Sequence, residues 1–238
     1  MGIAYNTNIV KDNLVIHLDA ANVKSYPGSG AVWNDLSGNG YSASLFNSPT
    51  FDSAGKFISF DGVTQYATFT TSSFNTGNNK MFSFEVLFKM RELPTAEYGA
   101  NGHIIGGQNG DNVVLYVNPA VDSASELNLV YDDTRYTAGT GHITNSKISA
   151  NEWVHWVCCG DGANNTIDHY INGVPDKISG AVVLGQEVKP WNTFKIAYDS
   201  RWATYSKLDI AMFKQYDKKL SEVEVIQNFE SLRWRYGI

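Results

Sequence analysis

The chain has 238 residues, of which 43% are hydrophobic and 18% charged, enough apolar residues for a full core and too little charge for a disordered or coiled-coil protein. Its net charge of −6 argues against nucleic-acid binding, because neutralising phosphates requires a basic surface. The 13% aromatic content, with 21 glycines against 6 prolines, favours β-sheet. No apolar run approaches the roughly 18 residues of a membrane span, and the first residues lack the basic and apolar regions of a signal peptide. Cys158 and Cys159 are adjacent, which excludes a disulfide-stapled scaffold.

Short runs of alternating apolar and polar residues, separated by Gly, Asn, Asp and Ser, predict a series of strands. The first lies at 14–18, and residues 32–47 are interpreted as irregular because of a turn cluster at 35–40. Segments 57–60 and 65–70 flank Asp61 and Gly62 and predict a hairpin or a bent strand. The strongest signal is at 82–90, which places on one face Phe82, Phe84, Val86, Phe88 and Met90.

Further strands are predicted at 103–105, 113–117, 127–131, 153–159, 167–171, 194–197 and 208–216, with a tight turn at Asn172 and Gly173. Only the C-terminus predicts a helix, where Ser221 and Glu224 have the spacing of a capping box. An apolar stripe then follows for docking on the sheets: Val225, Ile226, Phe229 and Leu232. We find no linker and expect a single domain: an all-β antiparallel sandwich or barrel with a short C-terminal helix.

Catalytic patterns are mostly absent. A glycosidase needs two carboxylates facing one bond, and the strand that carries Glu85 has no second acid on the same face. We therefore interpret Glu85 as a structural residue on the face opposite the phenylalanines. A catalytic alternative would need a partner from another strand, for which Asp168 and Asp209 are the candidates.

Metal sites are not strongly indicated either. The five histidines show no i, i+2 pair that would place two imidazoles on one strand face. Cys158 and Cys159 point to opposite faces of their strand and are interpreted as small buried hydrophobes. Oxygen-rich loops at Asp132 and Asp133, at 161–165 and at Asp199 keep calcium open as an alternative, although Asp and Asn are also ordinary turn formers. We expect no cofactor, with calcium as the alternative and no defined metal site.

An ordered series of motifs resembles the concanavalin A-like, laminin-G-like jelly-roll domains common in structural proteins of tailed bacteriophages. The N-terminal motifs are LVIHLDA (14–20), SYPGSG (25–30), Trp33, DLSGNG (35–40), PTF (49–51), and FDG (60–62) with Tyr66. The later ones are FSFEVLFK (82–89), NEWVH (151–155), YINGV (170–174), residues 208–216, Leu220-Ser221 and RYG (235–237).

The resemblance implies two antiparallel sheets packed face to face, one of them curved into a shallow groove, over residues 14–238, with residues 1–13 as an N-terminal arm. The family includes lectins, carbohydrate-binding modules, glucanases and virion proteins, so the fold does not determine the function. The chain lacks the closely spaced acids of the glucanases, so we expect no enzymatic activity. We predict a virion structural or attachment protein (head decoration, fibre or baseplate component), assembled in the host cytoplasm, whose partners are other virion proteins and copies of itself. A glycan-hydrolysing enzyme of the same fold and a purely architectural protein without a ligand stay open.

Carbohydrate binding, to a cell-surface glycan, is the further expectation. Sugar recognition stacks aromatic faces on pyranose rings and places planar polar groups against the hydroxyls. The loop residues that offer such groups are Tyr98, Asp132, Asp133, Arg135, Tyr136, Trp191, Arg201, Trp202 and Tyr205.

Overall fold

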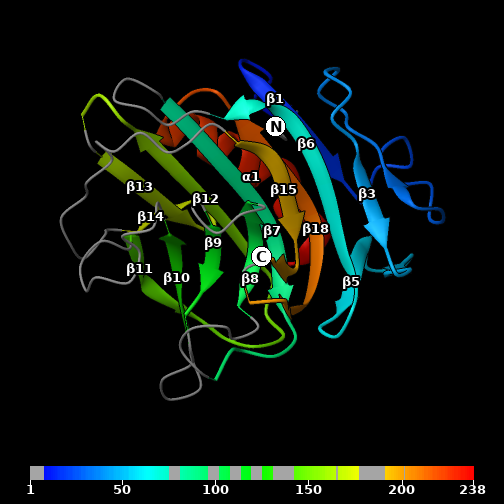
Figure 1. The fold of residues 1–238 in the computed structure, drawn as a ribbon. Coiled ribbons are helices and arrows are strands. Elements are labelled where there is room, and N and C mark those ends of the chain that lie inside the picture. The colour runs from blue at the N-terminus through cyan, green and yellow to red at the C-terminus, as the bar shows by residue number, and fades with distance from the viewer. Residues whose placement is uncertain are drawn as a thin grey trace, which may run out of the picture.

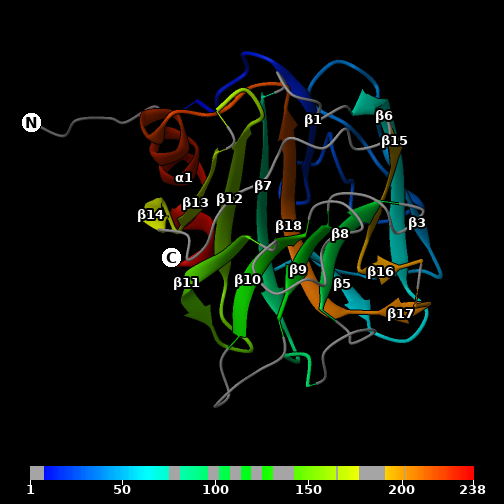
Figure 2. The same ribbon diagram turned by 60° about the vertical axis from the view of Figure 1, so that its left-hand side comes forward.

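The computed structural model describes residues 8–74, 81–95, 102–107, 114–118, 125–130, 142–164, 166–176, 191–200 and 202–238. Two antiparallel β-sheets pack face to face, and a single described helix, α1 (Glu222–Tyr236), lies on the outer surface of one of them (Figures 1 and 2). This confirms the predicted all-β two-sheet sandwich with a C-terminal helix. No helix in the described ranges is both long enough and apolar enough to cross a membrane.

The sheet that carries the helix, here the back sheet, has eight strands among the described residues. Its order is β14 (Val174–Asp176), β13 (Thr166–Ile171), β12 (Val154–Asp161), β7 (Met81–Met90), β18 (Lys207–Tyr216), β5 (Phe57–Asp61) and β4 (Thr50–Asp52), with β1 (Leu14–Asp19) also paired to β18. The turn between β13 and β14 is formed by Asn172 and Gly173, both at positive φ (50° and 76°), as predicted.

The opposite sheet, here the front sheet, also has eight strands in the part of the chain that the structure describes. Its order is β11 (His142–Ile148), β10 (Ser125–Val130), β9 (Val114–Val117), β8 (His103–Gly107), β15 (Trp191–Ile196), β6 (Tyr66–Phe74), β3 (Ala43–Phe46) and β2 (Val32–Trp33). A small two-stranded ribbon of β16 (Tyr198–Asp199) and β17 (Thr204–Tyr205) lies beside it, at the lower right of Figure 2.

Two predictions for the N-terminal third were wrong. Residues 57–70 do not form a hairpin, because β5 belongs to the back sheet and β6 to the front sheet. One carboxylate oxygen of Asp61 accepts hydrogen bonds from the backbone N–H groups of residues 63–65, and this loop carries the chain from one sheet to the other. The segment interpreted as irregular, 32–47, contains β2 and β3, which have only 2 and 4 residues and are too short for a clear alternation.

The core lies between the sheets and follows the predicted alternation of β7. Phe82, Phe84, Val86, Phe88 and Met90 are each at most 1% exposed and face the front sheet. From that sheet Phe69 and Phe194 stack at 4.9 Å. The alternate residues of β7, which include Glu85, therefore point outward toward α1.

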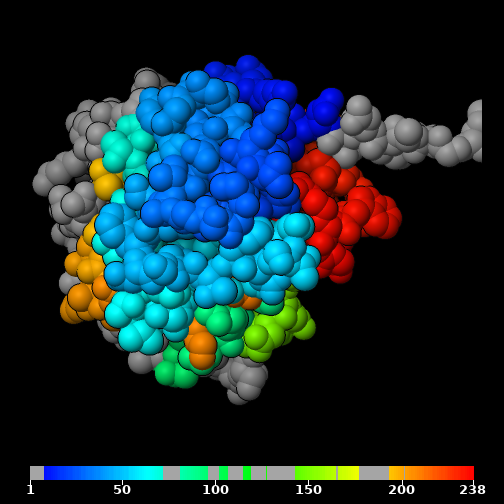
Figure 3. Space-filling view, turned by 90° about the vertical axis from the view of Figure 1, so that its right-hand side faces the viewer, coloured from blue at the N-terminus to red at the C-terminus, as the bar shows by residue number. Residues whose placement is uncertain are grey.

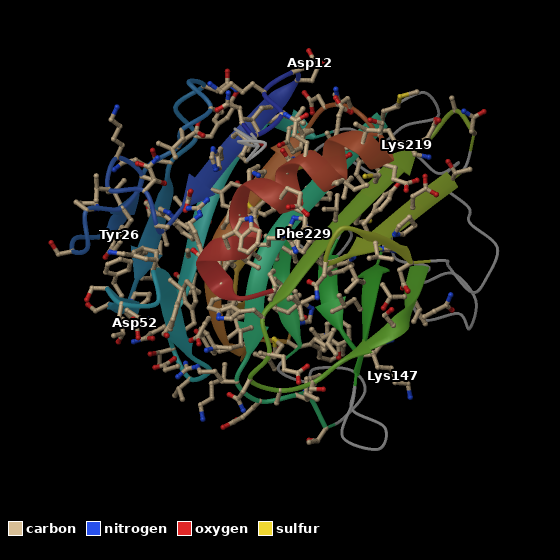
Figure 4. All side chains as sticks on the ribbon, turned by 180° about the vertical axis from the view of Figure 1, so that it is seen from behind. Asp12, Tyr26, Asp52, Lys147, Lys219 and Phe229 are labelled. Carbon is tan, nitrogen blue, oxygen red and sulfur yellow. The ribbon has the colours of Figure 1, made fainter. Side chains whose placement is uncertain are left out.

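Helix α1 begins at the predicted capping box. The backbone N–H of Glu224 donates to the Ser221 hydroxyl oxygen, and the backbone N–H of Ser221 donates to the Glu224 carboxylate. The helix ends at Gly237, whose φ of 72° is left-handed. Its buried residues are Val225, Asn228, Phe229 and Leu232, whereas Ile226 is 39% exposed and was wrongly included in the docking stripe. Figure 4 shows α1 crossing the back sheet with Phe229 near its middle.

Candidate functional site

The most strongly buried charges lie beneath α1. Glu85 on β7 and Lys214 on β18 are 0% and 1% exposed, and the ammonium nitrogen lies 2.9 Å from Glu85 Oε1. His155 Nε2 on β12 lies 3.0 Å from the same oxygen, while Asn228 on α1 donates its amide to Oε2 at 2.7 Å. Burial alone would raise the pKa of Glu85, but Lys214 and then His155 outweigh burial and lower the pKa to about 2. We call these four residues the Glu85 cluster.

The N-terminal segment closes the Glu85 cluster. The backbone N–H of Val10 donates to Asn228 Oδ1 at 2.8 Å, and the Tyr216 hydroxyl donates to the Val10 carbonyl at 3.2 Å. Val10 itself is only 7% exposed. Within the predicted N-terminal arm, residues 8–13 thus pack against the sandwich, whereas residues 1–7 lie outside the described residues.

Glu85 does not form a catalytic carboxylate pair with either candidate partner, Asp209 or Asp168. Glu85 is sealed under α1 rather than open to a groove. Asp209 is 2% exposed and bound by Lys89 at 2.9 Å, Arg91 at 3.2 Å and the Ser59 hydroxyl at 2.6 Å. Asp168 forms an ion pair with Lys219 at 2.6 Å. The interpretation of Glu85 as a structural residue agrees with this geometry.

The oxygen-rich loops serve local structure where they are described. Asp161 accepts hydrogen bonds from the backbone N–H groups of Ala163 and Asn164 and from the Asn164 amide. Asp199 pairs with His103 Nε2 at 2.9 Å. In the part of the chain that the structure describes, no three His, Cys, Asp or Glu side chains are grouped to hold a metal ion. Asp132 and Asp133 lie outside the described residues, so calcium stays a prediction there.

A group of aromatic residues gathers on the outer face of the front sheet. Phe46 on β3 and Tyr66 on β6 stack with ring centroids 4.7 Å apart and planes within 2°. Tyr198 on β16 lies 5.2 Å from Tyr66, and Tyr205 on β17 lies 4.6 Å from Tyr198. Lys195 on β15 places its ammonium 4.7 Å from the Tyr198 centroid and 5.8 Å from that of Tyr66. We call these five residues the tyrosine cluster.

Strand alternation explains why the tyrosine cluster faces outward. On β6, Ala67 and Phe69 are buried in the core, so Tyr66 and Thr68 occupy the other face. On β15, Phe194 and Ile196 are likewise in the core, which turns Lys195 outward beside Thr68. Phe46 pairs with Tyr66 across β3 and β6 and is 39% exposed. In Figure 3 the segments from β15 to β17, in amber and orange, border the blue and cyan N-terminal segments along the left edge.

The polar ends of the tyrosine cluster are not paired within the described part of the chain. Among the described residues, the hydroxyls of Tyr66, Tyr198 and Tyr205 make no hydrogen bond, and Lys195 has no carboxylate partner. Burial, followed by the neighbouring phenols of Tyr205 and Tyr66, raises the pKa of Tyr198. Burial lowers the pKa of Lys195. The cluster therefore combines half-buried rings with hydroxyl and ammonium groups that have no partner among the residues that the structure describes.

A histidine–aspartate pair fixes the ribbon that carries Tyr198. Besides its 2.9 Å contact with Asp199, the next residue of β16, His103 packs edge-on against Tyr116 of β9 at 4.9 Å. This contact joins β16 to β8 and holds Tyr198 beside Tyr66. A rigid mounting of this kind lowers the entropic cost of ligand binding.

The predicted sugar-contacting residues are placed in part. Tyr205 belongs to the tyrosine cluster, and Trp202, 48% exposed, lies between β16 and β17 without a ring contact to the described cluster residues. Trp191 begins β15, but its side chain lies outside the described part. The other predicted residues also fall outside it: Tyr98, Asp132, Asp133, Arg135, Tyr136 and Arg201. The sequence reasoning missed Phe46, Tyr66, Lys195 and Tyr198 as site residues; the alternation of Tyr66, Thr68 and Thr70 was the available signal.

A hollow lies among the N-terminal loops, away from the tyrosine cluster. It has a volume of about 480 Å³ and is lined by Tyr26, Gly28, Ser29, Gly30, Ala31, Leu45, Asn47, Ser48, Pro49 and Phe51. The Tyr26 hydroxyl donates to the Gly30 carbonyl, and the Asn47 amide donates to the Thr64 carbonyl. No charged side chain lines it, and two of its principal polar groups are already paired. The tyrosine cluster is therefore the stronger candidate site.

Comparison with known proteins places this geometry in a family. Residues 61–226 match the laminin-G-type group of the concanavalin A-like lectin/glucanases superfamily. The chain belongs to this superfamily. No curated protein matches this concanavalin A-like chain by sequence.

Solved structures show the same concanavalin A-like fold at low identity. The binding domain of botulinum neurotoxin DC, in complex with SialylT, aligns with a TM-score of 0.66 and 12% identity over 94% of this chain and 52% of that one. Botulinum neurotoxin type C, whose cell entry is described as dependent on interaction with two ganglioside molecules, aligns with a TM-score of 0.65 and 12% identity over 94% of this chain and 52% of that one. Trypanosoma rangeli sialidase aligns with a TM-score of 0.63 and 18% identity over 94% of this chain and 33% of that one. The chain thus spans about half of the toxin structures and a third of the sialidase.

Proposed function

We propose that the tyrosine cluster binds carbohydrate and that the protein is a non-enzymatic attachment domain. The observation that carries the proposal is the set of half-buried rings whose hydroxyl and ammonium groups have no partner among the described residues. Aromatic faces with a few convergent polar groups are what a sugar-binding surface requires. The toxin structures, which are described as interacting with ganglioside or SialylT, support the proposal by analogy of fold.

The direct test is a glycan array followed by isothermal titration with wild-type protein and two variants. Phe46→Ala removes the ring that is 39% exposed at the edge of the cluster, and we expect affinity to fall about tenfold. Trp234→Ala is the matched control, because Trp234 is an aromatic residue 79% exposed on α1, on the far side of the sandwich. Its affinity should not change. Absence of sugar binding by the wild type at millimolar concentration, or equal loss in both variants, would contradict the proposal.

The proposal that the protein is not an enzyme rests on the Glu85 cluster and on the paired state of Asp209 and Asp168. Hydrolysis of a glycoside requires two carboxylates that can reach one bond. We expect purified protein to release no reducing sugar from the glycans that it binds. Release of reducing sugar by the wild-type protein would refute this part, and turnover that survives Glu85→Gln would place the catalytic residues outside the Glu85 cluster. The proposal also requires no cofactor, because the binding groups are protein side chains.

We further propose that the protein is part of a bacteriophage particle, as a head decoration, fibre or baseplate component. The ordered series of sequence motifs supports it. Mass spectrometry of purified particles and of pull-downs from infected cells tests it: we expect the protein in particles together with other virion proteins. Its absence from particles would overturn the virion assignment and leave the carbohydrate proposal standing.

A further inference from the structure

Lys195 differs from the other described cations in its surroundings. The other partly or fully buried lysines and arginines of the described chain each form an ion pair with a carboxylate: Lys89, Arg91, Lys207, Lys214, Lys218, Lys219 and Arg233. The exposed Arg235 is paired as well, with Asp19. The lysines without a carboxylate partner, at positions 11, 24, 56 and 147, are exposed and solvated. Lys195 is half-buried, its ammonium lies against the rings of Tyr198 and Tyr66, and it has no carboxylate partner among the described residues.

A partly desolvated ammonium without a counter-ion is energetically unfavourable. Cation–π contact with Tyr198 and Tyr66 compensates for only part of the lost hydration. The described carboxylate beside Tyr198 in sequence, Asp199, is already paired with His103. The position therefore favours an anionic group supplied from outside the described chain.

We propose that the tyrosine cluster selects acidic saccharides, with the ligand carboxylate bound by Lys195 and the sugar ring and hydroxyls bound by Phe46 and the tyrosine hydroxyls. This inference rests on the proposed carbohydrate function and specifies its ligand class. The ring faces, and the three phenols without a hydrogen-bond partner in the described ranges, favour a sugar over a simple carboxylate. The ammonium favours a charged sugar over a neutral one. A uronic acid and a sialic acid share this chemistry.

The test compares matched sugars by titration at low salt: methyl β-glucoside, methyl β-glucuronide and a methyl sialoside. The first two share the same ring and differ in the carboxylate. We expect one or both of the acidic sugars to bind about tenfold more tightly than the glucoside, as a charge-assisted contact implies. The preference should weaken at high salt. The acidic sugar that binds identifies the source of the carboxylate.

Three variants assign the preference to Lys195. Lys195→Met should retain glucoside binding and lose the preference for the acid, whereas Lys195→Arg should retain the preference. Lys147→Met is the charge-matched control: it removes the same unit of charge from an exposed position on β11 of the same sheet (Figure 4) and should retain the preference. Thermal melting checks that each variant is folded.

The outcomes separate the two proposals. Equal affinity of the wild type for glucoside and acidic sugars, or an acid preference that survives Lys195→Met, would overturn the acidic-sugar inference and leave carbohydrate binding intact. Failure of the wild type to bind any of the sugars would overturn both.

Discussion

For Glu85, the position in its strand predicts the face of the sheet on which the side chain lies, but the partners of the side chain come together only in the folded protein. Alternation along β7 places it opposite the phenylalanines, and three other elements then supply Lys214, His155 and Asn228. A buried ion pair is costly to break from one side, because the remaining charge stays desolvated. The Glu85 cluster therefore fastens β7, β12, β18 and α1 to each other.

Removing one partner should be more harmful than removing both. We expect Lys214→Met to lower the free energy of unfolding by about 3–5 kcal/mol, and Glu85→Gln combined with Lys214→Met to recover part of that loss. Asp12→Asn, which breaks an ion pair with Lys218 whose carboxylate is 73% exposed, is the control and should cost about 0–1 kcal/mol. Urea denaturation measures all three. A single variant as stable as the control would show that the pair is not buried in solution.

Acid should destabilise the protein in two steps. Burial, followed by Lys214, lowers the pKa of His17 from 6.5 to about 4. Between these two pH values the unfolded chain binds a proton at His17 that the folded chain does not, so the free energy of unfolding falls as the pH drops from 6.5 to 4. The pKa of Glu85 is lowered from 4.5 to about 2, so its stabilisation is complete above 4.5 and is lost as the pH falls toward 2. Urea titrations at a series of pH values should show a smaller upper step in His17→Asn. An unchanged upper step in that variant would refute the assignment.

The two thiols should be unreactive in the folded protein. Burial raises the pKa of Cys159 to about 12 and raises that of Cys158 as well, so neither forms the reactive thiolate at neutral pH. A thiol reagent should label neither cysteine in native buffer and both after unfolding in guanidinium. Rapid labelling of native protein would contradict the burial of either side chain.

At the scale of elements, the turn between β13 and β14 and the helix α1 depend on each other. Gly173 has a φ of 76°, and a Cβ placed there would lie 2.6 Å from the Phe229 ring. The turn can therefore approach the helix only because residue 173 lacks a side chain.

Two glycine substitutions separate backbone strain from packing. Gly30→Ala meets no atom within 4 Å at a φ of 98° and should cost about 1–2 kcal/mol from backbone strain alone. Gly173→Ala carries the same kind of strain and, because it also displaces Phe229, should cost about 1–3 kcal/mol more. Urea unfolding curves give both values. Equal losses would mean that α1 does not rest on this turn.

Elements also show what the sequence could and could not predict. The long central strands and the capped helix were predictable, because their alternation and capping box are local. The crossing at Asp61 was not, because a hairpin and a sheet-to-sheet loop share the same turn residues. Tyr66 and Lys195 lie 129 positions apart in the chain numbering, so only the pairing of β6 with β15 brings them together. Tyr205 could be proposed on residue type alone, without its neighbours.

At the scale of the whole molecule, the proposed function gives the two outer faces different roles. Helix α1 crosses the back sheet and buries the Glu85 cluster beneath it (Figure 4). The tyrosine cluster lies on the opposite side, across the core from the helix (Figure 2). Under the proposed function, charged residues of the back sheet contribute to stability and aromatic residues of the front sheet bind the ligand.

Mapping the bound sugar onto the protein surface tests this division most directly. In an NMR titration of isotopically labelled protein with methyl β-glucuronide or a methyl sialoside, the largest amide shifts should fall on Phe46, Tyr66, Lys195, Tyr198 and Tyr205, while α1 and the Glu85 cluster stay unchanged. Saturable shifts centred on the loop pocket at Tyr26 or on α1, with none at the tyrosine cluster, would contradict it.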